Sequence, residues 1–550
     1  MTKGLLTTVL CAFVAASCST KADCRGDFCG TIVIAIGGEP ETLFPPASQT
    51  TAADAVADLI FLKLADIGPG MNTVGDEGFL PRLAESWEWE DSVTLVFNLN
   101  QLARWHDGAP VRAEDVEFTF AVYTDTVVAS PKASVLERIS SVTPRNNGQV
   151  EFKFRLPYPE QFYDATHYMR ILPRHVLDTI PRVSLTSHPI TRAPVGSGPY
   201  RLVSWRASET IELVADSNFF LGRPGLARVI FRVTPDMESA LAQVLAGEAD
   251  VLKQLETGAN VDRFNAAPHL RTIEYPSSGY TYLQFNMRDP EDPEAPHPLF
   301  RNRMIRRALA MAVNQQELID AVLGGLGDRT IGPVSKMLSI WNDQIPSLSY
   351  DTTRALELLN GLGWTDTDGD GYLDRSGRRL EFELAIPASS RSRRQAAVVI
   401  QDQLRRVGVN MVVAELELNT LISRVTSGRF DVFFGSRTQD PSPSTIREAW
   451  SSSGIGGANF GSYSSSEFDR LIDSAIESQQ ADSAMTLWHR AVAHINADAP
   501  AVWLYSPNAV AAVHRRIEGV TIRPDQWTAT LWTWRIPESR MIARDRRGAP

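Results

Sequence analysis

Residues 83–87 read LAESW, residues 105–110 read WHDGAP and residues 113–116 read AEDV, and these three stretches decide the fold of the chain. Residues 93–99, which follow the first stretch, alternate as a half-buried strand does. The His-Asp-Gly run of the second stretch predicts a tight turn, because Asp accepts backbone N–H bonds and Gly tolerates positive φ. The tryptophans of the first two stretches are predicted to be buried framework residues, since each offers a large apolar surface.

Strand-like and helical patterns alternate along the rest of the chain. Predicted strands lie at residues 31–36, 150–154, 210–214, 229–233 and 280–287. Predicted amphipathic helices lie at residues 237–245, 304–313, 396–407 and 467–476. Mixed elements of this kind predict α/β lobes rather than a sandwich or a helix bundle. After residue 18, no apolar run approaches the ~18 residues that a membrane span needs.

Composition narrows the class of function. A formal net charge of −11 argues against a nonspecific nucleic-acid surface, which would need a basic footprint. The chain is 43% hydrophobic and 22% charged, which is typical of an ordinary globular protein. Its sequence contains no HExxH, GxSxG or Walker A motif, so we expect a protein that is not an enzyme. A secreted hydrolase of unfamiliar type is the least favoured alternative.

The N-terminus has the pattern of an export signal. A short positive start, an apolar run and small residues precede Cys18, which resembles the cysteine of a bacterial lipobox. We therefore predict a lipoprotein signal peptide at residues 1–18, acylation of Cys18 and a tether at residues 19–30; ordinary signal cleavage is the alternative. Cys24 and Cys29 are a candidate disulfide in an oxidising compartment. The predicted location is extracytoplasmic, periplasmic or at the cell surface, lipid-anchored to a membrane.

Read together, these segments resemble the family 5 extracytoplasmic solute-binding proteins of peptide, dipeptide and nickel ABC importers. Besides the three opening stretches, VGSGPY at residues 195–200, LAGEADV at residues 245–251 and residues 303–314 match motifs of that family in order. The resemblance covers residues 31 to about 535. It implies an α/β fold of the type II periplasmic-binding-protein class: a Venus flytrap with two lobes and an extra domain.

The resemblance also implies how the chain is divided. Lobe I would consist of residues 31–70, 196–275 and 505–550, with an accessory domain at residues 71–195 and lobe II at residues 276–504. Strands at residues 280–286 and 502–505 would then act as hinges that absorb the backbone change on closure.

Two residues are alternative candidates for the main ligand contact. In peptide-binding relatives, an Asp in the loop after the strand equivalent to residues 430–435 pairs with the α-ammonium group of the peptide. Counting back from the Asp-Pro pair places Arg437 at that position, and an Arg there would repel an amine and favour a carboxylate. A gap in the alignment would instead give the role to Asp440, and both assignments stay open. Lesser candidates for the cleft are Tyr280, Trp450, Asn459 and Phe44.

An acidic loop is a candidate calcium site. Asp366, Asp368, Asp370 and Asp374 occupy positions 1, 3, 5 and 9 of an EF-hand-like pattern. Position 12 is Gly377 instead of the bidentate Glu, so an Asx-rich turn is the other interpretation. We expect no cofactor apart from this candidate structural calcium.

The resulting hypothesis is a monomeric substrate-binding lipoprotein of an ABC transporter. It would capture oligopeptide-like or other small polar solutes by lobe closure and deliver them to the transmembrane subunits of an ABC permease. The same fold binding a non-peptide acidic or metal-complex solute is an alternative, as is a sensory receptor.

Overall fold

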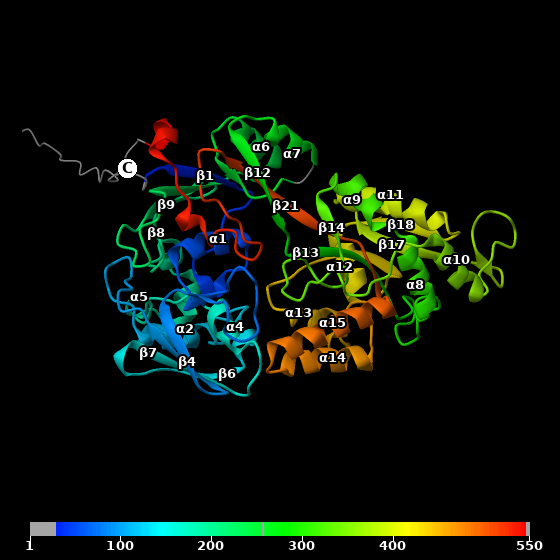
Figure 1. Cartoon of the computed structure of the whole chain (residues 1–550), viewed down its shortest axis with the longest axis horizontal. Coiled ribbons are helices and arrows are strands. Elements are labelled where there is room, and N and C mark those ends of the chain that lie inside the picture. Colours follow the sequence, from blue (N-terminus) through cyan, green and yellow to red (C-terminus); the bar gives the residue numbers. More distant parts are fainter. Residues whose placement is uncertain (1–28, 256–257, 546–550) are drawn as a thin grey trace, which may run out of the picture.

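The computed structural model describes residues 29–255 and 258–545, apart from the side chain of Asn147. An eight-stranded sheet organises the first lobe (Figure 1). Its strands are β1 (Thr31–Ile36), β8 (Tyr200–Arg206), β9 (Thr210–Ala215), β10 (Arg228–Val233), β11 (Val251–Leu252), β12 (Leu270–Pro276) and β21 (Tyr505–His514), with β14 (Gly327–Arg329) beside β21. The helices of this lobe are α1 (Thr51–Ile60), α6 (Met237–Leu245) and α7 (Gly258–Asn265).

A five-stranded sheet organises the second lobe, in the order β18-β17-β19-β13-β20. Its strands are β13 (Gly279–Phe285), β17 (Glu381–Pro387), β18 (Asn410–Leu416), β19 (Val432–Thr438) and β20 (Ala501–Trp503). The α-helices are α8 (Arg303–Ala312), α9 (Gln315–Leu323), α10 (Thr352–Gly361), α11 (Arg391–Arg405), α12 (Leu418–Thr426), α13 (Thr445–Trp450), α14 (Ser466–Glu477) and α15 (Ala481–Asp498). The predicted helices at residues 304–313 and 467–476 are confirmed as α8 and α14.

A four-stranded antiparallel sheet, in the order β4-β5-β7-β6, forms the accessory domain. Its strands and α-helices are β4 (Ala84–Asp91), β5 (Thr94–Leu99), β6 (Ile139–Pro144), β7 (Gln149–Phe154), α2 (Ala113–Tyr123), α3 (Ala133–Leu136), α4 (Gln161–His167) and α5 (Arg174–Leu177). Two further pairs are β2 (Ala65–Asp66) with β3 (Leu80–Pro81), and β15 (Asp374–Arg375) with β16 (Arg378–Arg379). The α/β prediction is confirmed, and the exact domain boundaries stay a prediction.

Two pairs of consecutive strands connect the lobes. Strand β12 pairs with β21 in the first lobe, and β13, which follows β12, pairs with β20 in the second. The chain therefore changes sheet at Ser277–Ser278 and again at Leu504, beside the predicted hinge strands (Figure 1). Thr281 donates its hydroxyl to the Tyr505 carbonyl at 2.9 Å, so the two crossings are also bonded to each other. Hinge motion at this place stays a prediction.

The opening sequence stretches meet around one buried carboxylate. Trp105 donates its indole N–H to Asp115 at 3.3 Å, and Asp115 accepts the backbone N–H of Arg112 at 2.8 Å and that of Arg174 at 2.9 Å. The Asp115 carboxylate thus accepts the N–H of Arg112, just before α2, and the N–H of Arg174, the first residue of α5. It therefore joins the start of α2 to the start of α5. The bond from the indole joins Trp105 of the WHDGAP stretch to Asp115 of the AEDV stretch.

His106 joins the accessory domain to the first lobe. Its Nδ1 accepts the Gly196 N–H at 3.2 Å, and its Nε2 lies 3.0 Å from the Gly198 carbonyl, which fits a neutral ring protonated at Nε2. Gly198 in turn donates its N–H to the Ile60 carbonyl at 2.7 Å. A Cβ on Gly198 would lie 2.5 Å from the Leu59 oxygen, so only glycine fits this close backbone approach.

A buried ion-pair network fixes the end of the chain to its first strand. Arg516 pairs with Asp250 at 2.9 Å and with Asp545 at 2.7 Å, and it donates to the Thr31 carbonyl at 2.7 Å. Asp545 accepts the Thr31 N–H at 2.7 Å. The guanidinium group of Arg516, just after β21, therefore connects the start of β1 with the C-terminal segment.

Some predictions concern residues near the N-terminus. The predicted signal peptide, Cys18 and Cys24 lie outside the described residues, while Cys29 is buried. Within residues 29–255 and 258–545, no helix combines the length and the apolar character needed to cross a membrane.

Gly198→Ala should destabilise the protein by about 2–3 kcal/mol, because the new methyl group meets backbone atoms that have no room to move away. Gly37→Ala is the control, since a Cβ at Gly37 meets no atom within 4 Å. Urea denaturation of both variants measures the difference. Equal midpoints for Gly198→Ala and the unmodified protein would contradict the close approach.

Candidate ligand-binding site

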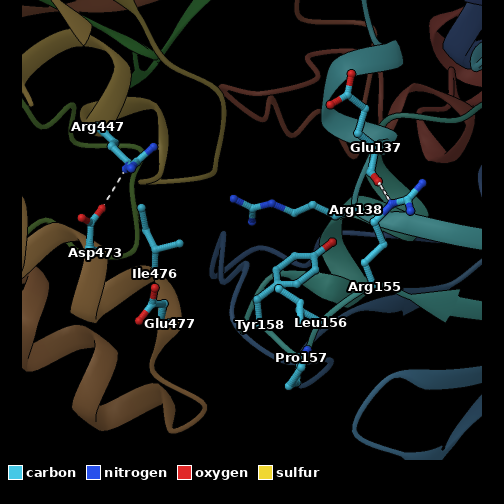
Figure 2. A pocket seen from close by; sticks show the side chains of 10 residues that line it. All are labelled: Glu137, Arg138, Arg155, Leu156, Pro157, Tyr158, Arg447, Asp473, Ile476 and Glu477. Atoms are coloured by element: carbon cyan, nitrogen blue, oxygen red, sulfur yellow. Dashed lines mark hydrogen bonds and ion pairs between the residues drawn. The ribbon is translucent and has the colours of Figure 1, made fainter. Parts of the chain in front are cut away.

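A cleft of about 610 Å³ lies between the accessory domain and the second lobe. Figure 2 shows its two walls: Arg138 and Tyr158 face Arg447 and Ile476, while Arg155 points away and donates to the Glu137 carbonyl at 2.7 Å. Arg447 is held by Asp473 at 2.8 Å, whereas the Arg138 guanidinium lies 4.7 Å from the centre of the Tyr158 ring. The cleft therefore combines apolar surface with charged groups from both sides, as ligand pockets do.

A second hollow, of about 500 Å³, lies on the other side of the loop at residues 157–161. Tyr158 lines both hollows, and residues 479 and 481 supply the wall from the second lobe. The loop at residues 157–161 is therefore a ridge of the accessory domain that separates the two hollows.

Hydrogen bonds join this ridge to the second lobe. Glu160 accepts the hydroxyl groups of Ser442 at 2.7 Å and Ser444 at 2.6 Å, and on its own side that of Thr73 at 2.5 Å. Tyr168 donates its hydroxyl to Asp440 at 3.2 Å, which adds a second bond between the two parts. The described conformation is thus one in which the accessory domain and the second lobe are in contact.

Three carboxylates gather at this contact. Burial raises the pKa of Asp440 to about 6, and the nearby Glu160 adds to the rise. Burial raises the pKa of Asp164 to about 8, again with a contribution from Glu160, while the Tyr158 hydroxyl donates to Asp164 at 2.8 Å. Over the described part of the chain, no Lys, Arg or His forms an ion pair with Glu160, Asp164 or Asp440. The contact is therefore a concentration of negative charge that an added cation or proton would stabilise.

The structure separates Arg437 from Asp440. Arg437 lies opposite Tyr280 in the pairing of β19 with β13 and donates to the Ala458 carbonyl at 3.0 Å. Asp440 lies beyond the end of β19, where it faces Tyr168 of the accessory domain. Which of the two occupies the ammonium-binding position of the family stays a prediction, but only Asp440 lies among carboxylates.

The four lesser candidates are buried. Trp450 donates its indole N–H to the Tyr280 hydroxyl at 3.0 Å, so these two residues are brought together in the core of the second lobe. Asn459 donates to the carbonyls of Ser451 and Tyr463, and Phe44 lies in the core of the first lobe. Each packs within its own lobe, and contact with a ligand stays a prediction for all four.

The acidic loop gathers three of its four predicted calcium ligands. Carboxylate oxygens of Asp366, Asp368 and Asp374 lie within 4.8 Å of one another. Asp370 is instead paired with Arg379, and Asp366 accepts the N–H groups of Gly369 and Gly371. The bonds are those of an Asx-rich turn, and calcium binding stays a prediction.

Comparison with known proteins identifies the family. Residues 78–458 match the model of the bacterial extracellular solute-binding proteins, family 5, which is more than half of the chain. The chain belongs to this family. Its relatives are solute-binding proteins and not enzymes, and the family is extracytoplasmic.

Two relatives match this family 5 chain over nearly its whole length. The chain is 26% identical over 516 residues to the oligopeptide-binding protein AppA of Bacillus subtilis, and the match covers 92% of this chain and 91% of AppA. The structure of that AppA in complex with a nonapeptide has a TM-score of 0.72 at 25% identity, covering 94% of this chain and 100% of that one. The substrate-binding protein CtaP of Listeria monocytogenes has a TM-score of 0.80 at 21% identity, covering 92% and 99%. The two-lobe fold with an extra domain is thereby confirmed.

Sequence reasoning missed the accessory-domain side of the site. Glu160, Asp164 and Tyr168 were not predicted, although residues 157–168 (PYPEQFYDATHY) concentrate tyrosines and acids in one short segment. This concentration of aromatic residues could have indicated a buried segment, because exposed loops rarely contain so many of them.

The contact between the accessory domain and the second lobe should strengthen as the pH falls. Asp440 faces Tyr168 across the contact, and a carboxyl group whose pKa is higher there than in water binds its proton more tightly there, so its stabilisation is complete below about pH 4 and is lost as the pH rises through 6. Small-angle scattering of ligand-free protein should show a smaller radius of gyration at pH 5 than at pH 8.5.

Asp440→Asn should flatten this pH dependence, whereas Glu477→Gln, which removes a carboxylate of the neighbouring cleft, should not. A radius of gyration that stays the same between pH 5 and 8.5 in the unmodified protein would show that these groups do not govern the contact.

Proposed function

We propose that this family 5 protein captures peptide-like solutes between its lobes and delivers them to the transmembrane subunits of an ABC permease. The supporting observation is a cleft of about 610 Å³ with walls from both the accessory domain and the second lobe. A full-length relative, AppA, is named as an oligopeptide-binding protein, and its structure holds a nonapeptide.

The charge of the contact suits the amino end of a peptide. Glu160, Asp164 and Asp440 are three largely buried carboxyl groups that form no ion pair in the described structure, and Arg138, which lies over the Tyr158 ring, is the cation that acts on Asp164. An ammonium group of the solute would neutralise part of this negative charge and donate hydrogen bonds to the carboxylate oxygens. In this proposal Asp440 pairs with the α-ammonium group of the solute. The hydroxyl groups of Ser442 and Ser444 donate hydrogen bonds to Glu160.

Binding is coupled to closure in this proposal. The bonds of Glu160 and Tyr168 to the second lobe exist only while the lobes are together. A solute cation that relieves the repulsion therefore favours the closed form over the open one. The solute leaves chemically unchanged, and the closed form is what the permease would recognise.

The N-terminal proposal is a lipid anchor. Acylation of Cys18 followed by a tether at residues 19–30 would hold the binding lobes near the permease.

Native mass spectrometry of protein purified without refolding should show masses that correspond to short peptides. Asp440→Asn should reduce the bound fraction, because its amide no longer neutralises an ammonium group. Asp402→Asn is the control, since Asp402 pairs with Arg406 at 2.6 Å and lines neither of the two hollows. Turnover of a bound compound, or a bound metal ion or haem in place of any peptide, would contradict the proposal.

Cys18→Ser should release the protein from the membrane fraction of expressing cells, because the hydroxyl group is not acylated by the thiol-dependent route. Ultracentrifugation followed by immunoblotting measures the partition. Membrane retention of Cys18→Ser equal to that of the unmodified protein would rule out an anchor at this residue.

A further inference from the structure

Three side chains in and beside β20 each have a buried polar atom with no hydrogen-bond partner in the part of the chain that the structure describes. These atoms are the hydroxyl oxygen of Thr330, the amide oxygen of Asn496 and the indole Nε1 of Trp503. The three residues are 3%, 2% and 9% exposed, so bulk water does not solvate these groups. A buried polar group that forms no hydrogen bond costs free energy, and three such groups in one place indicate a bound partner.

Two side-chain amides hold these residues close together. Gln315 donates its Nε2 to the Thr330 carbonyl at 3.0 Å and to the Trp503 carbonyl at 2.9 Å. Asn496 donates its Nδ2 to the Ile331 carbonyl at 2.7 Å and to a second carbonyl at 2.9 Å. Because two carbonyl groups accept from Nδ2, the orientation of the Asn496 amide is fixed, and its Oδ1 remains available as an acceptor.

The same three residues line one small cavity. Its volume is about 20 Å³, and apolar residues of α8 and β20 complete its wall. A space of this size accommodates one water molecule and has no room for a peptide, a sugar or a nucleotide. Cavities that stay empty in proteins are apolar, whereas a polar cavity of sufficient size holds water. The cavity therefore has both the size and the lining of a water site.

The hydrogen-bonding chemistry of the three atoms also matches water. The indole N–H only donates, the amide oxygen only accepts, and the hydroxyl group does either. A water molecule that accepts from Trp503, donates to Asn496 and bonds to Thr330 forms three hydrogen bonds, which is the usual number for a buried water. A metal cation cannot accept the indole N–H, and a halide anion cannot donate to the amide oxygen. Water is thus the small ligand that satisfies all three groups.

The cavity lies at a crossing between the lobes. Thr330 directly follows β14, and Arg329, the last residue of β14, pairs with Tyr505 of β21 in the first-lobe sheet. Trp503 is the last residue of β20, which is the end strand of the second-lobe sheet. A water molecule that bonds to both Thr330 and Trp503 therefore joins the two sheets where the chain passes from one to the other.

We propose that one buried water molecule binds Thr330, Asn496 and Trp503 and is a structural part of the connection between the lobes. Water-mediated hydrogen bonds are nearly as favourable as direct ones. The connection therefore keeps its polar groups satisfied, although these three groups form no direct hydrogen bond with one another. The site rests on the fold alone and is independent of the solute that the cleft takes.

A crystal structure of the unmodified protein, at a resolution that shows ordered waters, tests the site directly. We expect electron density for one water molecule within about 3.2 Å of at least two of the three atoms. A cavity without such density, a water that reaches fewer than two of these atoms, or direct bonds from the three atoms to other protein groups would overturn the proposal.

Nuclear magnetic resonance tests the same water in solution. In protein that carries isotopically labelled tryptophan, the indole N–H signal of Trp503 is the one that Trp503→Phe removes. This signal should show a rotating-frame Overhauser cross-peak to water. Thr330→Val should reduce the cross-peak by about half or more, because the water loses one of its three hydrogen bonds. Thr420→Val is the matched control, since Thr420 is an exposed residue of α12. The absence of the cross-peak in the unmodified protein, or its full retention in Thr330→Val, would contradict the water site.

Discussion

The pairing of two crossing strands is the constraint on which the rest of this molecule depends. Strands β12 and β13 leave one sheet and enter the other within two residues, and β20 and β21 make the reverse crossing next to them. Because the two crossings are hydrogen-bonded to each other, they fix the register in which the lobes are joined, and the predicted hinge motion would change only the angle between the lobes. The cleft and the acidic contact both lie between parts of the molecule that this connection joins.

Much of the fold could be predicted because its signature residues act through strong local chemistry. Trp105, Asp115 and His106 satisfy backbone groups that would otherwise be buried without partners, so their spacing is readable in the sequence. The start of α11 was placed at residue 396, five residues late, because its first turn carries Arg391, Arg393 and Arg394 and shows no apolar face. Patterns of apolar residues report burial and say little about a charged helix end.

Less of the candidate site could be predicted, since its parts meet only in three dimensions. Glu160 and Ser442 are 282 residues apart, and no spacing rule connects them. The sequence placed Arg437 and Asp440 in one loop, but it did not show that the first lies beside β13 while the second faces the accessory domain. Opposite charges three residues apart thus belong to two environments: Asp440 lies among carboxyl groups, and Arg437 lies beside tyrosines and a backbone carbonyl.

The network around Arg516 has a consequence for how such a protein is made. Its partner Asp545 accepts the backbone N–H of Thr31, so the first strand lacks one of its bonds until residue 545 has arrived. A chain that is threaded through a secretion channel from its amino end would therefore leave the channel with this lobe incomplete. In such a chain, late completion would keep the polypeptide unpacked during transit until residue 545 had crossed the membrane.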